Sequence, residues 1–261
     1  MGHRQHEKQM VIPGKRAVMQ AFDAGISAST LFLSDSLRED EVLADLASAA
    51  KSAGVRIKRV PQADFKKRFA EIERADQGVV LIADPFAYTP LGDLISNAEE
   101  DFKKSGGALI VVCDHITDAG NLGAIIRSAD SAGASGVVIP NRRSAQVTSS
   151  TYKTSAGAAA NMPIACVANI RQTIEELKSA GFWTVGCTEH ADDVVWDVDI
   201  AGRTALVMGN EQKGISDLVL KTCDDACRLP QLGSVSSLNV AQAATVMMYE
   251  WLRQCKAAPS S

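Results

Sequence analysis

Short apolar runs alternate with helical patterns along the chain, and in its second half the runs are continuous instead of alternating with polar residues. Continuous apolar runs are typical of parallel strands that are buried on both faces. They lie at Ala108–Cys113, Gly136–Ile139, Ile164–Ala168, Trp183–Cys187, Thr204–Met208 and Ala226–Leu229. Helices are expected at Leu122–Ala132, Arg171–Ala180, Gly214–Thr222 and from about Leu238 to Arg253. This order predicts an α/β domain with a mostly parallel sheet covered by helices on both faces.

The first 85 residues predict a separate small α/β module. Helices are expected at Val11–Ala24 and Arg38–Ala53, and strands at Thr30–Leu33, Val55–Val60 and Gly78–Ala83. Thr89 and Pro90 then start a connecting helix, which Gly106 and Gly107 stop. We therefore expect a module over 1–85, a linker helix over 86–107 and a second domain over 108–261.

The composition is that of an ordinary folded protein. The 261 residues are 46% hydrophobic and 22% charged, which is enough to bury a sizeable core. The longest apolar runs are too short to cross a bilayer, and the residues after Met1 are polar, unlike a signal peptide. We therefore expect a cytoplasmic protein with no membrane partner.

The spacing of the six cysteines argues against a metal site and against disulfides. Cys113, Cys166 and Cys187 each end an apolar run, where cysteine behaves as a small buried hydrophobe. Cys223 and Cys227 are close together but have no second pair or histidine cluster nearby. The sequence predicts free structural thiols and no metal.

Positive charge is concentrated near the N-terminus, although the formal net charge is −4. Residues 1–85 hold 13 Lys and Arg against 12 Asp and Glu, whereas the rest holds 14 against 19. Within Lys51–Arg68 there are seven basic residues and one acid. A basic face on an acidic protein suits phosphate binding, and an ordinary solvated face is the alternative. The RNA-binding candidates, here named the basic cluster, are Arg56, Lys58, Arg59, Lys66 and Lys67.

The first segment with candidate chemistry is Asp114–Ala129, which follows a strand and opens a helix. Ligands of open α/β sheets bind at such junctions. The segment lacks the third glycine of a dinucleotide fingerprint and the Lys-Ser pair of a phosphate loop. Arg127 lies two turns into the helix beside apolar neighbours. A surface charge is possible there, but we favour an arginine that reaches into a cleft.

The second segment, Ala205–Ser216, runs from an apolar strand into a polar turn bracketed by glycines. Gly209 permits close approach of the backbone to a ligand. Glu211 lies near a helix start, where a carboxylate is stabilised. Taken alone, this segment would be interpreted as a turn followed by a helix cap.

The third segment, Leu229–Ala241, is a loop of small hydroxyl residues that enters the long closing helix. Its serines could simply cap that helix. With Ser237 and Asn239 side by side, the loop also offers several hydrogen-bond donors and acceptors in a small space.

Together the three segments resemble the signature of the SpoU (TrmH) class of SPOUT methyltransferases, over about residues 108–254. The matching residues are Asn121, Arg127, Gly209, Glu211, Ser237, Asn239 and Val240. Ala119 departs from the pattern, because many relatives have proline there. The first 85 residues resemble the L30e-like RNA-binding domain that often precedes this catalytic domain.

The resemblance implies an α/β-knot fold, in which the C-terminal segment forms a trefoil knot, and a homodimer. It implies S-adenosylmethionine (AdoMet) as the cofactor. The cofactor contacts would fall at Thr188, Gly209, Leu229 and Leu238. The catalytic residues would be Asn121, Arg127, Glu211, Ser237 and Asn239.

The implied reaction is methyl transfer to a ribose 2′-OH in structured RNA, most like a guanosine of 23S rRNA. Because a guanidinium stays protonated, we expect Arg127 to hold a phosphate and lower the pKa of the hydroxyl, not to act as a base. Transfer RNA is the first alternative substrate. A catalytically silent RNA-binding assembly factor is a second alternative, and a nucleotide-dependent oxidoreductase lacks its glycine fingerprint.

Overall fold

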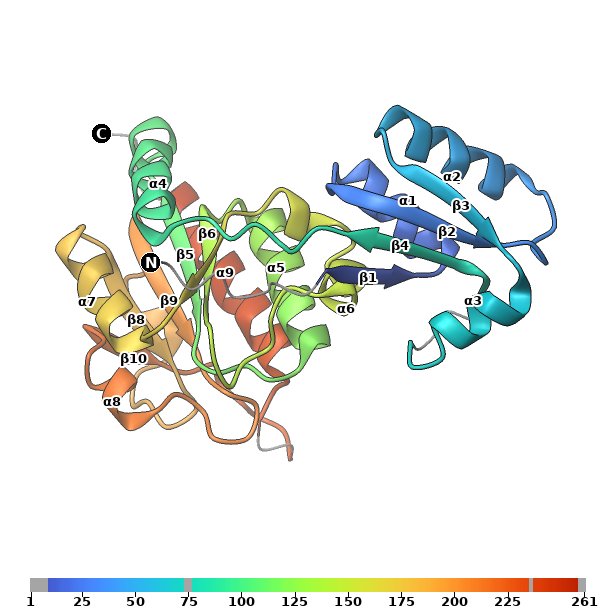
Figure 1. The fold of residues 1–261 in the computed structure, drawn as a ribbon. Coiled ribbons are helices and arrows are strands. Elements are labelled where there is room, and N and C mark those ends of the chain that lie inside the picture. Colours follow the sequence, from blue (N-terminus) through green and yellow to red (C-terminus); the bar gives the residue numbers. More distant parts are fainter. Residues whose placement is uncertain (1–8, 73–76, 235–236, 258–261) are drawn as a thin grey trace, which may run out of the picture. The chain divides into compact units, whose positions relative to one another are not determined.

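The computed structural model describes residues 9–72, 77–234 and 237–257, and they form two compact units (Figure 1). The first unit runs to Ala87 and also includes Val147–Asn161. The second consists of Tyr88–Gln146 and the residues from Met162 onward. Each unit is built on one sheet.

The first unit has a four-stranded mixed sheet in the order β1-β4-β2-β3. Its elements are β1 (Met10–Pro13), α1 (Lys15–Asp23), β2 (Ala28–Ser34), α2 (Glu41–Ser52), β3 (Arg56–Val60), α3 (Gln62–Arg68) and β4 (Val79–Ala83). β3 pairs in parallel with β2 and forms an edge of the sheet, whereas β4 runs antiparallel to both β1 and β2. The small α/β module predicted for the first 85 residues is thus present.

The helix predicted at Val11–Ala24 is wrong in its first part. Met10–Pro13 forms strand β1, which pairs with β4, and α1 begins only at Lys15. Gly14 separates the two elements with a φ of 95°, a conformation that favours glycine. The Pro-Gly pair was the available signal for this break.

Aromatic residues anchor α3, a helix that the apolar pattern did not predict. Phe65 on α3 is only 2% exposed and packs with Phe69, Phe32 and Val80 in one cluster. Burying a phenylalanine side chain stabilises a fold by about 1.5–3 kcal/mol, which holds this short helix against the sheet. The guanidinium of Arg68 lies 4.5 Å from the centre of the Phe32 ring.

The second unit has a six-stranded sheet in the order β10-β8-β9-β5-β6-β7, with every neighbouring pair parallel. The strands are β5 (Ala108–Cys113), β6 (Gly136–Pro140), β7 (Ile164–Val167), β8 (Trp183–Cys187), β9 (Arg203–Met208) and β10 (Asp225–Cys227). The helices are α4 (Leu91–Ser105), α5 (Ala119–Ala132), α7 (Ile170–Ser179), α8 (Asp217–Leu220) and α9 (Val240–Ala257), with a 3₁₀ turn at Val195–Asp197. The parallel sheet predicted from the continuous apolar runs is confirmed.

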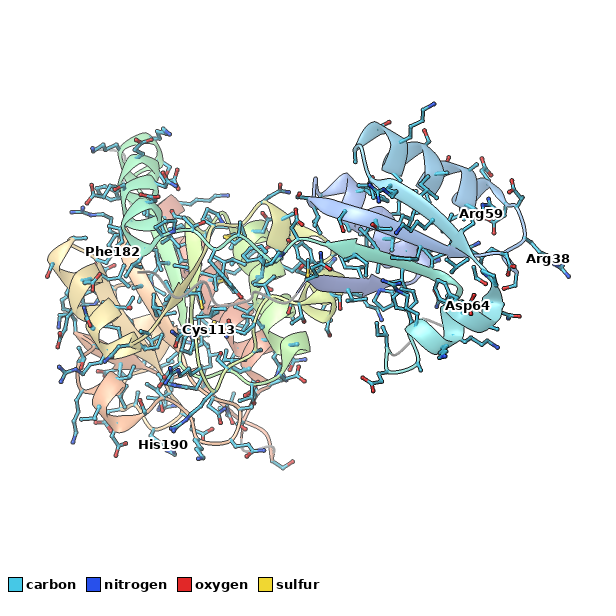
Figure 2. All side chains as sticks on the ribbon, in the orientation of Figure 1. Arg38, Arg59, Asp64, Cys113, Phe182 and His190 are labelled. Atoms are coloured by element: carbon cyan, nitrogen blue, oxygen red, sulfur yellow. The ribbon has the colours of Figure 1, made fainter. Side chains whose placement is uncertain are left out.

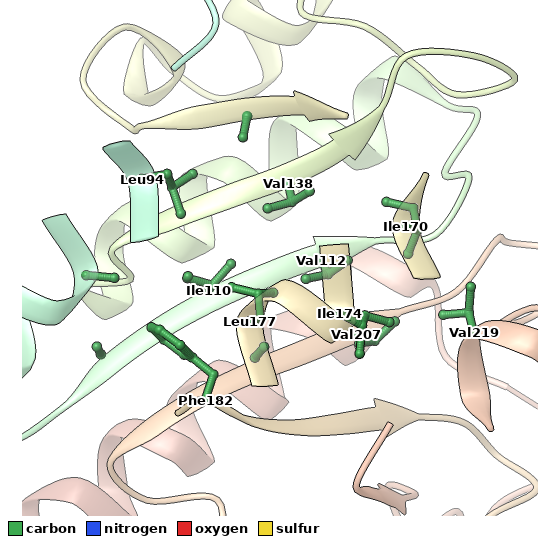
Figure 3. Close-up of a cluster of buried hydrophobic side chains, with 14 of the residues drawn as sticks. Leu94, Ile110, Val112, Val138, Ile170, Ile174, Leu177, Phe182, Val207 and Val219 are labelled. Carbon is green, nitrogen blue, oxygen red and sulfur yellow. The ribbon is translucent and has the colours of Figure 1, made fainter. Parts of the chain in front are cut away.

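Both faces of this sheet are covered. Alternate residues of the central strands, such as Ile110, Val112 and Val207, pack against Leu94 of α4 and Ile174 of α7 (Figure 3). Helices α5 and α9 pack against each other and cover the other face (Figure 1). The linker helix predicted over 86–107 is therefore α4, and it is part of the core of the second unit.

Two local features shape the loops beside the sheet. Asp118 caps α5 by accepting a hydrogen bond from the backbone nitrogen of Asn121 at 2.7 Å. After β9, Asn210 and Gly214 exchange backbone hydrogen bonds at 2.9 Å and close a tight turn. Because this turn uses the residues up to Gly214, α8 spans Asp217–Leu220, which is shorter than the predicted Gly214–Thr222.

The segment Val147–Asn161 lies in the second domain by sequence but packs with the first unit. It carries α6 (Ser149–Thr154) and a 3₁₀ turn at Ala158–Ala160. Helix α6 packs against α1 and β1, and the Tyr152 ring lies 6.1 Å from that of Phe86. The first unit is therefore discontinuous in sequence, which a reading of local patterns did not predict.

The six cysteines are free. Burial raises the pKa of Cys113 to about 12, with help from the nearby Glu211 and Asp114 carboxylates, so this thiol stays protonated at neutral pH. Among the helices that the structure describes, none is long and apolar enough to span a bilayer.

Candidate active site

Two loops meet where β5 and β9 end. These strands are parallel neighbours, so their carboxyl ends lie at the same edge of the sheet. The Asp114 side chain, 1% exposed, accepts a hydrogen bond from the backbone nitrogen of Ser216 at 2.8 Å. In the other direction, the side-chain amide of Asn210 donates to the carbonyl oxygen of His115 at 2.8 Å. The loop after β5 is thereby fastened to the loop after β9.

The Glu211 carboxylate accepts hydrogen bonds from both loops. Its Oε2 accepts from the backbone nitrogen and the hydroxyl of Thr117, each at 3.2 Å, and from Asn210 Nδ2 at 3.3 Å. Its Oε1 accepts from the backbone nitrogen of Asp118 at 3.2 Å and from Asn121 Nδ2 at 3.0 Å. This one carboxylate therefore organises the start of α5.

These donors keep Glu211 ionised. Partial burial acts to raise the pKa of this carboxyl, but the hydrogen bonds from Asn121 and from the backbone of Thr117 and Asp118 outweigh it. The resulting pKa is below the ordinary glutamate value of 4.5. At neutral pH Glu211 is thus an acceptor of hydrogen bonds and a poor base.

A second asparagine extends this arrangement to the third motif. Asn121 Oδ1 accepts a hydrogen bond from Asn239 Nδ2 at 3.0 Å. Asn239 Oδ1 in turn accepts from the backbone nitrogen of Ala241 at 2.9 Å, at the start of α9. The Glu211–Asn121–Asn239 chain therefore joins one residue from each of the three motifs identified in the sequence.

A cavity of about 370 Å³ lies beside the Glu211–Asn121–Asn239 chain of hydrogen bonds. All four residues predicted to contact the cofactor line it, namely Thr188, Gly209, Leu229 and Leu238. Three of the residues predicted to be catalytic line it as well, namely Glu211, Ser237 and Asn239. A pocket of this size suits a small organic ligand. Direct contact of these residues with AdoMet stays a prediction.

The lining of the cavity fits a cofactor that has a flat aromatic base and a charged tail. Met208, Val240 and Met247 give it an apolar wall, and Glu189 and Glu211 contribute carboxylates. Gly209 brings the backbone close, because an added Cβ would lie 2.3 Å from backbone atoms of the facing turn. The tight turn that lines the cavity thus requires glycine at this position.

The structure does not bring Arg127 to the cavity. Its side chain lies on the exposed face of α5 and forms no ion pair with any residue in the described ranges. The expectation that Arg127 reaches into a cleft is therefore not met within a single chain. Its helix is nevertheless fixed, because the hydroxyls of Ser128 on α5 and Thr245 on α9 lie 2.7 Å apart.

The basic cluster lies on two neighbouring elements of the first unit and is exposed throughout. Arg56, Lys58 and Arg59 lie on the edge strand β3, and Lys66 and Lys67 lie on α3. One of these charges is partly neutralised, since Arg59 forms an ion pair with Glu39 at 2.8 Å. Figure 2 shows Arg59 and the acid Asp64 on this unit.

Thr117, Asp118 and Asn210 complete the site and were missed by the sequence reasoning. Asp118 had a signal, because an aspartate directly before a helix is a common cap. Thr117 and Asn210 had none, since their role depends on the meeting of two loops that are more than 90 residues apart.

Comparison with known proteins identifies the family of this chain. Residues 108–249 match the SpoU rRNA methylase family, and residues 11–89 match the RNA 2′-O ribose methyltransferase substrate-binding family. The chain belongs to the SpoU rRNA methylase family. A relative from Mycolicibacterium vanbaalenii, named an uncharacterized tRNA/rRNA methyltransferase, is 36% identical over 256 residues, covering 98% of this chain and 80% of the relative.

Solved structures of SpoU methyltransferases have the same fold. AviRb from Streptomyces viridochromogenes, in complex with AdoMet, aligns with a TM-score of 0.76 and 28% identity over 96% of this chain and 91% of AviRb. An AdoMet-bound rRNA methyltransferase from Sinorhizobium meliloti aligns with a TM-score of 0.74 and 26% identity, over 96% and 89% of the two chains.

This SpoU protein is therefore an AdoMet-dependent RNA methyltransferase. Its predicted fold class is confirmed, an α/β methyltransferase domain of the SPOUT type that follows a small substrate-binding domain. The trefoil threading of the C-terminal segment stays a prediction.

Proposed function

We propose that this protein methylates the ribose 2′-OH of a guanosine in 23S rRNA. The observation that carries the proposal is the Glu211–Asn121–Asn239 chain, because it joins three loops into one polar site beside a cofactor-sized cavity. The names of the two matching families, rRNA methylase and 2′-O ribose methyltransferase substrate binding, support ribosomal RNA and a ribose oxygen.

The protein groups have to position a ribose hydroxyl and manage its charge. AdoMet, held by the cavity that Gly209 and Leu229 help to line, supplies an activated methyl group. Asn121 and Asn239 hold each other through their side chains, so each keeps a fixed orientation beside the cavity that Asn239 lines. Glu211 fixes Asn121 and is a poor base. Arg127, exposed on α5 and outside the cavity, is available to hold a phosphate of the bound RNA next to the target and so to lower the pKa of the hydroxyl electrostatically.

The same proposal includes binding of RNA by the basic cluster. Its five side chains are exposed on adjacent elements, and exposed lysines and arginines suit phosphate contacts. The Nζ atom of Lys58 also lies 5.7 Å from the centre of the Phe32 ring. This contact limits the directions in which the Lys58 side chain can point.

We also propose a cytoplasmic homodimer. Six free cysteines fit a reducing compartment, where RNA and AdoMet are also found. The apolar residues of α9 that suggested a dimer interface are largely used within the chain, since Ala244, Met247 and Trp251 are buried. Val246 and Tyr249, 38% and 48% exposed, are the large apolar side chains of this helix that a second copy would cover.

In the test, purified protein and methyl-labelled AdoMet are incubated with unmodified 23S rRNA and, in a separate reaction, with unmodified tRNA. We expect incorporation into 23S rRNA at one guanosine, and loss of incorporation with Asn121→Ala. Labelling of tRNA alone would overturn the choice of ribosomal RNA. No labelling of either RNA by a protein that binds AdoMet would favour a silent RNA-binding factor.

A further inference from the structure

A strained arginine turn lies at the same edge of the sheet as the active site. Residues 141–144 follow β6, which is parallel to β5 and next to it, so the turn leaves the sheet at the edge where Glu211 and Asn121 lie. Arg143 has a φ of 55°, in the left-handed region that disfavours residues with a Cβ. Strained residues of this kind concentrate at functional sites.

The turn is held firmly despite this strain. The backbone nitrogen of Asn141 donates to the carbonyl oxygen of Val167 at 2.8 Å. On the other side, the Ile116 carbonyl oxygen accepts from the Ala145 nitrogen at 2.7 Å and from the Ser144 hydroxyl at 2.9 Å. Hydrogen bonds thus fix the backbone on both sides of Arg142 and Arg143.

The same bracing links the turn to the reaction site. Ile116, whose carbonyl oxygen accepts hydrogen bonds from Ser144 and Ala145, directly precedes Thr117. Thr117 donates two hydrogen bonds to Glu211. The support of the arginines and the support of the Glu211–Asn121–Asn239 chain therefore come from two consecutive residues, Ile116 and Thr117.

The loops at this edge carry mostly negative charge, so binding of an RNA backbone here needs additional cations. The loops after β5 and β9 carry three carboxylates, Asp114, Asp118 and Glu211, and one lysine, Lys213. Arg142 and Arg143 are exposed, and neither forms an ion pair with any residue that the structure describes. Their guanidinium groups are free to take phosphates with paired hydrogen bonds.

We propose that Arg142 and Arg143 form a phosphate clamp that holds the RNA backbone beside the ribose to be methylated. This clamp belongs to the second unit and is distinct from the basic cluster of the first. The proposal rests on RNA as the substrate and adds two positioning residues to its binding. The clamp acts on the RNA backbone, so it contributes affinity and position without choosing the base.

The test removes both charges while keeping the turn. Arg142→Ala combined with Arg143→Gly does this, because glycine adopts a φ of 55° without strain. The matched control is Lys103→Ala with Lys104→Ala, which removes two exposed charges near the end of α4, just before β5 begins at the opposite edge. RNA affinity is measured against salt concentration on an unmodified 23S rRNA fragment, beside AdoMet affinity by calorimetry and steady-state kinetics.

We expect the arginine variant to bind RNA roughly tenfold to a hundredfold more weakly, and its salt slope to fall by about 1.5, as for two lost phosphate contacts. KM for RNA should rise more than kcat falls, while AdoMet affinity and the control variant stay like the parent. Replacement of both arginines by lysine should restore most of the affinity.

Parent-like RNA affinity and salt slope in the arginine variant would overturn the clamp. If that variant fails to fold and therefore does not bind AdoMet, the single substitution Arg142→Glu tests the clamp instead, because it leaves Arg143 and the turn unchanged. A parent protein that neither binds nor methylates RNA would instead refute the proposed function, so the two failures are distinguishable.

Discussion

Replacement of Glu211 by glutamine tests whether this carboxylate organises the site. Glutamine has the same shape but carries an amide NH₂ in place of one oxygen. If the amide replaces Oε1, two donors face it, from Asp118 and Asn121. If it replaces Oε2, three donors face it, from Thr117 and Asn210. Glu211→Gln therefore breaks hydrogen bonds in either orientation and removes the charge.

The expected loss of stability is modest, because Glu211 is exposed and water can replace the lost bonds. We expect the free energy of unfolding to fall by about 1 kcal/mol at pH 7, and the melting temperature by about 2–4 °C. The rate should suffer more, because Asn121 loses the partner that orients it. A misplaced catalytic contact costs on the order of a hundredfold in rate.

The pH dependence has a definite sign. The pKa of Glu211 is lower in the folded protein than its ordinary value of 4.5, so its stabilising contribution is complete above about pH 5. That contribution is lost as the pH falls through the folded pKa. The difference in melting temperature between the parent and Glu211→Gln should therefore be full at pH 7 and shrink below about pH 4.5.

The assay combines thermal melting from pH 3.5 to 8 with single-turnover methyl transfer at pH 7.5. Glu175→Gln is the matched control, because Glu175 is exposed on α7, does not line the cavity and forms an ion pair with Arg171 at 3.6 Å. We expect that control to keep the parent rate within a few-fold. A parent-like rate in Glu211→Gln, or a melting difference that does not change with pH, would refute the organising role.

Three further substitutions probe the cavity, the arginine and the RNA surface. Gly209→Ala should abolish AdoMet binding by calorimetry, since its Cβ would lie 2.3 Å from backbone atoms, and a parent-like affinity would contradict the close approach. Arg127→Ala should remove methyl transfer while AdoMet affinity stays within a few-fold, and loss of that affinity in a folded variant would show that Arg127 serves the cofactor. Neutralising the basic cluster should weaken RNA binding and flatten its salt dependence, whereas an unchanged slope would make the cluster an ordinary solvated face.

The sequence predicted the second unit well because its strands are buried on both faces and therefore continuously apolar. The four cofactor residues implied by the resemblance to the SpoU class, Thr188, Gly209, Leu229 and Leu238, all line the cavity. The errors have a common cause, which is dependence on distant partners. Strand β1 exists because β4 pairs with it, and α3 is fixed by the aromatic cluster that includes Phe32.

The same limit applies to the site. The residues of the Glu211–Asn121–Asn239 chain could be named from motifs, but their hydrogen bonds span 90 and 118 residues of sequence. The support from Thr117 and Asn210 was invisible for that reason. The exposure of Arg127 was not predicted either, because apolar neighbours in sequence do not fix the direction of a side chain on a helix.

Nucleoside mass spectrometry distinguishes methyl transfer to a ribose oxygen from methyl transfer to a base. Unmodified 23S rRNA is incubated with the protein and methyl-labelled AdoMet, digested to nucleosides and separated. We expect label in 2′-O-methylguanosine, with none when Asn121→Ala replaces the parent protein. Label in a base-methylated nucleoside, with the ribose unmodified, would contradict it.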